Sequence, residues 1–171
     1  MSGAPSNGWD SYVWQIQNSY SAKKGSYMKM NVCQHAAIIG NDGSPWATTS
    51  EWPGLSEYEH EQDTEDGGTT NVKVNEHKAA MQAAVGNRTP TIAGIRMGGM
   101  KYVLTNYDAS CNMSMLTKQG GGGAAVMKTK NAIVIGMWNK DAVMTNNMNQ
   151  NSGDCSLQVE KVANLLKEAG Y

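Results

Sequence analysis

Aromatic residues near the two ends of the sequence could together form a ligand-binding surface. Trp9 and Tyr12 are three residues apart, so on a helix their rings would share one side. Trp46 lies on an expected strand, and Tyr171 is the last residue of the sequence. In one groove these rings would suit polyproline II segments, because proline rings pack on aromatic faces and their free carbonyls accept hydrogen bonds from Trp N–H and Tyr O–H. Half-buried core aromatics are the alternative interpretation.

Residues that could do catalysis or bind a metal are scattered. His35, His60 and His77 have no metal-ligand spacing to one another or to a cysteine, and there is no Gly-x-Ser-x-Gly elbow. A calcium loop that started at Asp63 would need a carboxylate at its twelfth position, which is Val74. We therefore predict no enzymatic activity, no metal and no cofactor.

Four consecutive glycines, Gly120–Gly123, form the most prominent local motif. A phosphate-binding P-loop places Gly-Lys-Ser/Thr just before a helix, but Lys128 and Thr129 come too late and a strand is expected to follow the glycines. A turn between two strands is the expected role. A small-molecule-binding or enzymatic α+β domain built on this loop would need converging titratable groups, which the sequence does not supply.

Composition excludes several classes of protein. The 171 residues suit one domain, and 14 Lys and Arg against 15 Asp and Glu give a net charge of −1, which disfavours nucleic-acid binding. The longest apolar run, Ala132–Trp138, is far shorter than the ~20 residues that span a bilayer, and the first residues lack the features of a secretory signal. Cys33, Cys111 and Cys155 are far apart and odd in number, which predicts buried or half-buried thiols in a reducing cytosol.

Periodicity predicts which elements must position the aromatic residues. Helices are expected over about Gly8–Ser19, over Glu76–Val85 with Asn75 as its cap, and from a cap at Asp154 to Gly170. Between them the alternation of side chains and the glycine punctuation predict extended segments. These are Met28–Ile39, Trp46–Thr49, Thr91–Met97, Lys101–Tyr107, Asn112–Thr117, Ala124–Lys128 and Ala132–Trp138. The order indicates an α+β fold, with helices on the faces of an antiparallel sheet.

Several motifs, in order along nearly the whole chain, resemble those of the profilin family. They are Trp9–Val13, Ala36–Ala47, Trp52-Pro53 (where the family has Phe-Pro), Gly98–Tyr102, Lys118–Thr129, Ala132–Gly136 and Gly153–Tyr171. Each motif is weak alone, and together they are specific. The resemblance implies a central antiparallel sheet with the N- and C-terminal helices packed together on one face.

The resemblance also implies a function. Profilins bind monomeric actin, sequester it or deliver it to filaments, and so regulate actin polymerisation in the cytoplasm and cytoskeleton without being enzymes. They bind proline-rich partners such as formins in a separate groove, and many bind phosphoinositides. Here the basic residues are scattered, and Lys23-Lys24 is the only basic pair. A polyproline-binding module with weak or no actin binding is the alternative.

Matching the motifs residue by residue predicts two sites. The polyproline groove comprises Trp9, Tyr12, Trp46, Leu165, Leu166 and Tyr171. The actin-binding surface comprises Lys101, Thr105, Lys118, Asn151, Gly153, Ser156 and Lys161. Leu165 departs from the family, in which His or Tyr is common, and Lys161 replaces an acidic residue of some animal relatives.

One segment exceeds the compact family pattern. Residues 57–74 begin with a strongly acidic stretch, Glu57–Asp66, and resemble the acidic insertion of alveolate profilins. The loop Asn139–Ser152 is also long. Either segment could contact actin or be simply solvated.

Overall fold

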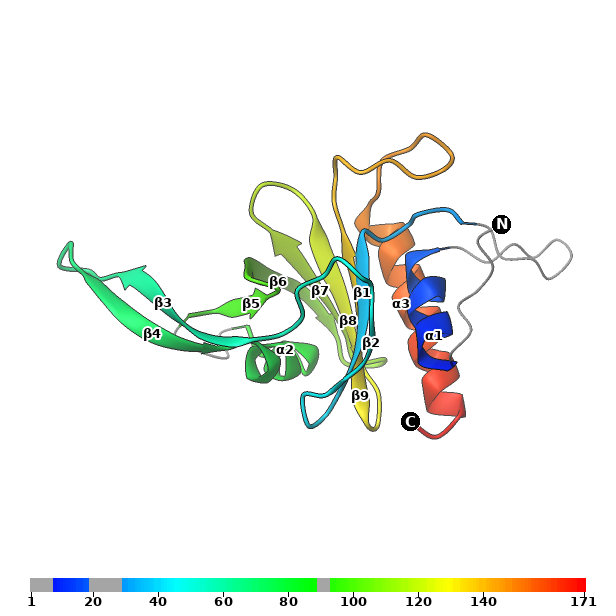
Figure 1. Ribbon diagram of the computed structural model, residues 1–171, viewed down its shortest axis with the longest axis horizontal. Helices are drawn as coiled ribbons and strands as arrows, with labels where there is room; N and C mark the ends of the chain where they lie inside the picture. Colours follow the sequence, from blue (N-terminus) through cyan, green and yellow to red (C-terminus); the bar gives the residue numbers. More distant parts are fainter. Residues whose placement is uncertain (1–7, 19–28, 89–92) are drawn as a thin grey trace, which may run out of the picture.

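A seven-stranded antiparallel sheet forms the centre of the computed structural model, which describes residues 8–18, 29–88 and 93–171 (Figure 1). Its strand order is β2 (Pro45–Thr48), β1 (His35–Gly40), β9 (Ala132–Trp138), β8 (Gly123–Lys128), β7 (Met113–Lys118), β6 (Met100–Asp108) and β5 (Ile95–Met97). Helices α1 (Gly8–Gln17) and α3 (Ser152–Glu168) pack together on one face, and α2 (Glu76–Ala84) lies on the other. The predicted α+β fold is confirmed.

Apolar residues at helical spacing attach α1 and α3 to the sheet. Val13 and Ile16 of α1 and Val159 and Leu166 of α3 are buried in one cluster with β1, β8 and β9. Gly136 on β9 allows this close approach, because a Cβ there would lie 2.6 Å from Cγ2 of Val159. Helices α1 and α3 are therefore held together by a shared core.

The opposite face is covered by the short helix α2, whose buried apolar side chains are all alanines. Ala79, Ala80, Ala83 and Ala84 of α2 are buried, and Ala80, Ala83 and Ala84 pack in a cluster with residues of β1, β5, β6, β8 and β9. Alanine both favours the helix and lets its axis lie close to the strands. The predicted cap is confirmed, because the Asn75 side chain accepts a hydrogen bond from the Lys78 N–H.

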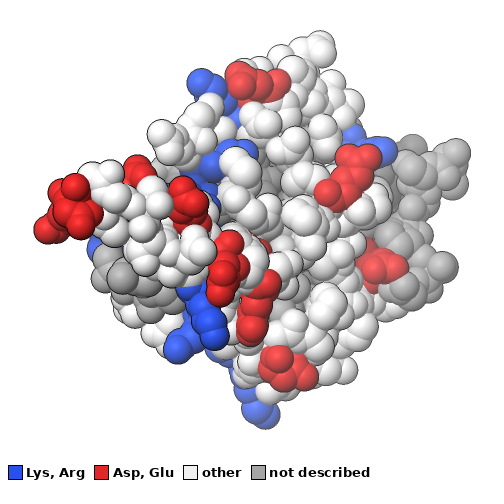
Figure 2. Space-filling model, turned by 60° about the vertical axis from the view of Figure 1, so that its left-hand side comes forward, with Lys and Arg blue, Asp and Glu red and all other residues white. Residues whose placement is uncertain are grey.

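The acidic segment is a hairpin that projects from the body (Figure 1). Strand β3 (Glu57–Asp63) pairs along its whole length with β4 (Thr69–Asn75). In β3 the acidic residues occupy the exposed positions, while Tyr58, His60 and Gln62 between them are half-buried. Figure 2, turned to bring this side of the molecule forward, shows Asp and Glu side chains gathered there.

A buried carboxylate anchors the base of this hairpin. Glu76, 1% exposed, accepts hydrogen bonds from the Ser56 N–H at 3.0 Å, the Tyr58 hydroxyl at 3.0 Å and the Gly99 N–H at 2.8 Å. These bonds join the first turn of α2 to β3 and to the β5–β6 turn. A second link is the Arg96 guanidinium, 2.9 Å from Nε2 of His60.

We expect that deleting residues 59–72 leaves a cooperatively folded protein. Tyr58 pairs with Val74 across the hairpin, so joining Tyr58 to Lys73 through Asn-Gly leaves a three-residue loop, Asn-Gly-Lys73, between the members of this pair. The deletion removes one buried apolar side chain, Val72, and keeps the bonds to Glu76. The free energy of unfolding should fall by no more than about 2 kcal/mol. Thermal unfolding followed by circular dichroism measures this, and loss of the cooperative transition would show that the hairpin supports the fold.

Two of the three cysteines lie side by side. Cys33 Sγ is 2.7 Å from Cys155 Sγ, and both side chains are fully buried where the segment before β1 meets the first turn of α3. Burial raises the pKa of the Cys33 thiol, and the contact with Cys155 acts in the same direction. Cys111 is half-buried, so the prediction of buried or half-buried thiols is confirmed.

Two predicted boundaries of helices and strands are wrong. Regular β1 begins at His35 rather than Met28, because Asn31 has a φ of 58° that a strand does not allow. The cap of α3 is Asn151 rather than Asp154, whose own N–H donates to the Asn151 side chain at 2.9 Å. The predicted turn at Gly120–Gly123 is confirmed, with positive φ at the first three glycines. Residues 19, 28, 91 and 92 of the predicted elements lie outside the described residues.

Candidate functional site

Four aromatic rings from three parts of the chain meet at one end of the molecule. The Trp9 ring centroid lies 5.8 Å from that of Tyr12, 4.6 Å from that of Trp46 and 5.0 Å from that of Tyr171. Trp46 and Tyr171 are 6.0 Å apart. We call these four residues the ring shelf. Trp9, Tyr12 and Trp46 are half-buried and Tyr171 is 41% exposed, so all four retain accessible surface.

The secondary structure places each ring. On α1, Val13 and Ile16 point into the core, which leaves Trp9 and Tyr12 at its margin. On β2, Trp46 alternates with the buried Ala47. Gly40, on the neighbouring strand, makes room for the indole, because a Cβ there would lie 2.7 Å from Nε1 of Trp46.

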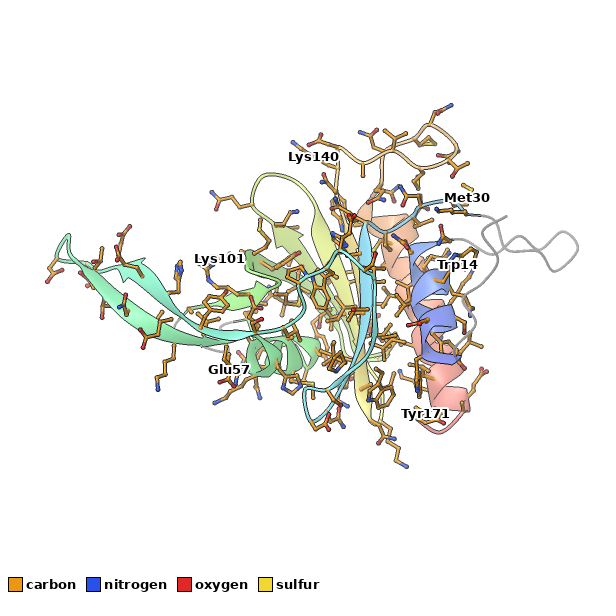
Figure 3. All side chains as sticks on the ribbon, viewed as in Figure 1. Trp14, Met30, Glu57, Lys101, Lys140 and Tyr171 are labelled. Carbon is orange, nitrogen blue, oxygen red and sulfur yellow. The ribbon has the colours of Figure 1, made fainter. Side chains whose placement is uncertain are left out.

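Backbone hydrogen bonds hold Tyr171 beside the shelf. Its N–H donates to the Leu166 carbonyl at 2.9 Å, and its carbonyl accepts from the Lys130 N–H at 3.2 Å. Figure 3 shows Tyr171 at the lower end of α3, where it meets the start of α1. The shelf is therefore fixed before any ligand arrives.

The two leucines predicted for the groove have different positions. Leu166 is fully buried in the cluster on which Trp9, Tyr12 and Trp46 pack, so it supports the rings and offers no surface to a ligand. Leu165 is 42% exposed and lines a separate hollow with Gln15 and Asn18, between α1 and α3. The shelf itself thus consists of the four aromatic residues.

The residues predicted for the actin-binding surface do not all lie together: they form two groups, and two residues lie apart from both. Asn151, Gly153 and Ser156 lie together at the start of α3, and Lys101 and Thr105 are exposed on β6. Lys161 is two turns farther along α3, roughly 12 Å from Gly153, and lines the same hollow as Leu165. Lys118 pairs with Tyr102 and shares its face of the sheet, away from α3.

Lys118 borders a small cavity of about 130 Å³ with His35, Trp52 and Tyr102. Burial lowers the pKa of His35, the charge of Lys118 lowers it further, and Glu51 acts in the opposite direction. At neutral pH His35 is therefore uncharged. Lys118 is only half-buried, so its ammonium group can still reach solvent at the rim.

Two exposed apolar residues lie near residues of the predicted actin-binding surface. Val103, on β6 beside Lys101, is 59% exposed, and Leu157, beside Ser156 on α3, is 48% exposed. The sequence pattern did not indicate them, because Val103 continues the apolar run Tyr102–Leu104 and Leu157 is an isolated apolar residue outside the stripe of α3. The basic pair Lys23-Lys24 lies outside the described residues.

Comparison with known proteins shows what this arrangement resembles. The family model described as Profilin matches residues 7–171. A profilin of Tetrahymena pyriformis is 32% identical over 168 residues, which cover 96% of this chain and 99% of that protein.

The chain belongs to the profilin family.

Solved profilins share its fold. Mouse profilin IIa, in complex with a double repeat from the FH1 domain of mDia1, matches with a TM-score of 0.58 at 19% identity, over 96% of this chain and 100% of that chain. Acanthamoeba castellanii profilin II matches with a TM-score of 0.56 at 24% identity, over 82% and 89% of the two chains. Profilins are a non-enzymatic, actin-binding family.

Within residues 8–18, 29–88 and 93–171, no three His, Cys, Asp or Glu side chains are grouped so as to hold a metal ion. In the same part of the chain, no helix has the length and apolar character needed to cross a bilayer.

Proposed function

We propose that this protein binds monomeric actin and regulates its polymerisation in the cytoplasm, and that its ring shelf binds proline-rich segments of partners such as formins. The observation that carries the second part is the approach of Trp9, Trp46 and Tyr171 to within 6.0 Å of one another. Such a surface matches the flat rings and free carbonyls of a polyproline II helix. The family relationship supports both parts.

The proposed actin-binding surface lies on the outer strands and the start of α3. Lys101 and Val103 share one side of β6, opposite the buried Tyr102 and Leu104. That side is also the side of the sheet on which α3 packs, and on α3 Leu157 is exposed. Exposed apolar residues with a neighbouring lysine suit a globular partner with an acidic surface, where the lysine speeds encounter and the apolar residues add affinity.

Reversing the lysine charges should weaken actin binding. We expect Lys101→Glu to lower the affinity for monomeric actin about five- to tenfold, because it removes an attraction and adds a repulsion. Lys118→Glu should have a smaller effect, because Lys118 lies on the opposite face of the sheet. The rate of nucleotide exchange on actin, titrated with each variant, measures the effect. Retention on immobilised oligoproline should stay unchanged.

A matched variant controls for net charge. Lys78→Glu makes the same change on α2, on the side of the sheet opposite Lys101, and should leave actin binding intact. If the wild-type protein does not affect exchange or polymerisation at all, the alternative of a polyproline-binding module without actin binding is supported. If Lys78→Glu weakens binding as much as Lys101→Glu, the assigned surface is wrong.

A further inference from the structure

A hollow of about 430 Å³ lies between α1, the start of β1 and the end of β2. Trp14 and two acidic residues, Asp10 and Glu51, are among the residues that line it. The described residues that line it include neither Lys nor Arg. His35, which also lines it, is uncharged at neutral pH because burial lowers its pKa. The described residues that line the hollow therefore combine an aromatic wall with a net negative charge.

This hollow continues the ring shelf along the same two elements. Asp10 directly follows Trp9 on α1, and Thr48 comes two residues after Trp46 on the same side of β2. From Trp9 to Trp14 the helix rises by about 7.5 Å, and from Trp46 to Thr48 the strand advances by about 7 Å. Figure 3 shows Trp14 higher along α1 than the Tyr171 end of the shelf. A ligand on the rings can thus reach the hollow without leaving the surface.

The chemistry of the hollow selects a cation. An aromatic face attracts a positive group within about 6 Å, and carboxylates beside it add to the attraction. Arginine fits better than lysine, because its planar guanidinium stacks on an indole and donates paired hydrogen bonds to a carboxylate.

We propose that the hollow binds a basic side chain, arginine in preference to lysine, carried by the proline-rich ligand of the ring shelf. A polyproline II helix advances by about 3.1 Å per residue, which places this side chain roughly two to four residues beyond the last proline on the rings. The ring shelf supplies binding to proline, and the hollow selects among proline-rich sequences. This inference rests on the proposed polyproline function.

The test compares peptides that differ at one position. Each has ten prolines and, three residues beyond them through a Gly-Ser spacer, either Arg or Gln; a second pair carries the same residue before the prolines. Calorimetric titration of the wild-type protein should give about five- to tenfold tighter binding for Arg than for Gln at one of the two ends. In Glu51→Gln the preference should fall below about twofold, and added salt should reduce it in the wild type.

Two variants separate the hollow from general charge and from the shelf. Glu65→Gln changes the net charge equally at the tip of the β3–β4 hairpin and should keep the full preference for Arg. Trp14→Leu should reduce the preference while the Gln peptides bind as before. Both variants stay interpretable because binding of the Gln peptides reports an intact shelf.

The outcomes are distinguishable. If the Gln peptides bind and Arg gives no advantage at either end, or if Glu51→Gln keeps the advantage, the hollow is not a specificity site and the proposed polyproline function stands. If none of the peptides binds the wild-type protein, the polyproline function fails and this inference fails with it.

Discussion

Replacing Trp9 with alanine should abolish retention on immobilised oligoproline. Trp9 is the one ring within 6 Å of the three others, so its loss removes the centre of the shelf. Central aromatic residues of binding surfaces contribute about 2–4 kcal/mol, which corresponds to a loss of affinity of at least roughly thirtyfold. Titration of an oligoproline peptide, followed by calorimetry, measures the loss.

The fold should survive this change, because Trp9 is half-buried at the margin of the core. Circular dichroism and the effect on actin nucleotide exchange serve as controls for folding. Tyr107→Ala is a matched variant, since it removes a half-buried ring from β6, far from the shelf in sequence and in the sheet order. Undiminished oligoproline binding by Trp9→Ala would refute the assignment of the groove.

A second large effect is expected from adding a methyl group at Gly136. The new Cβ would lie 2.6 Å from Cγ2 of Val159, 3.1 Å from Sγ of Cys155 and 3.2 Å from Cγ2 of Ile16, so both α1 and α3 must move outward. Overpacking of this kind lowers the free energy of unfolding by about 1–3 kcal/mol, and Gly136→Val should exceed Gly136→Ala. Urea unfolding measures the change.

The same substitution should also weaken oligoproline binding, because α1 carries two rings of the shelf and Tyr171 follows α3. Gly8→Ala provides the comparison, since nothing lies within 4 Å of a Cβ at Gly8. That variant should unfold at the wild-type urea concentration or slightly above it. Equal midpoints for Gly8→Ala and Gly136→Ala would mean that the helices do not pack as closely on β9 as described.

Much of the fold can be predicted because local patterns and tertiary contacts agree. The stripe Cys155, Val159, Val162, Leu166 and Ala169 indicates α3 and its buried face; the first four residues are buried, whereas Ala169, the C-cap, is exposed. The aromatic cluster can be predicted only in part. Ring spacing pairs Trp9 with Tyr12, but the meeting of Trp9 with Trp46 and Tyr171 depends on long-range packing that periodicity does not contain; there the family resemblance supplied the link.

The residues of the proposed actin-binding surface were harder to predict, because the face on which each lies depends on strand register. Register shifts between Leu104 and Asn106 on β6, where the Thr105 hydroxyl donates to the Met115 carbonyl. After such a bulge, the residues that follow on β6 face the opposite side of the sheet from the one that simple alternation predicts. No residue type in the sequence indicates the bulge. The position of Lys118 on the α2 face likewise follows from its pairing with Tyr102 rather than from its motif.

The close approach of Trp9 and Trp46 gives the protein an intrinsic spectroscopic signal for ligand binding. Two indoles whose centroids are 4.6 Å apart share excited states, and the chain contains five tryptophans and no phenylalanine. A ligand that settles on these rings must alter both their emission and their coupled signal in ultraviolet circular dichroism. Occupancy can therefore be followed without attaching a dye, and the change should vanish in Trp9→Ala.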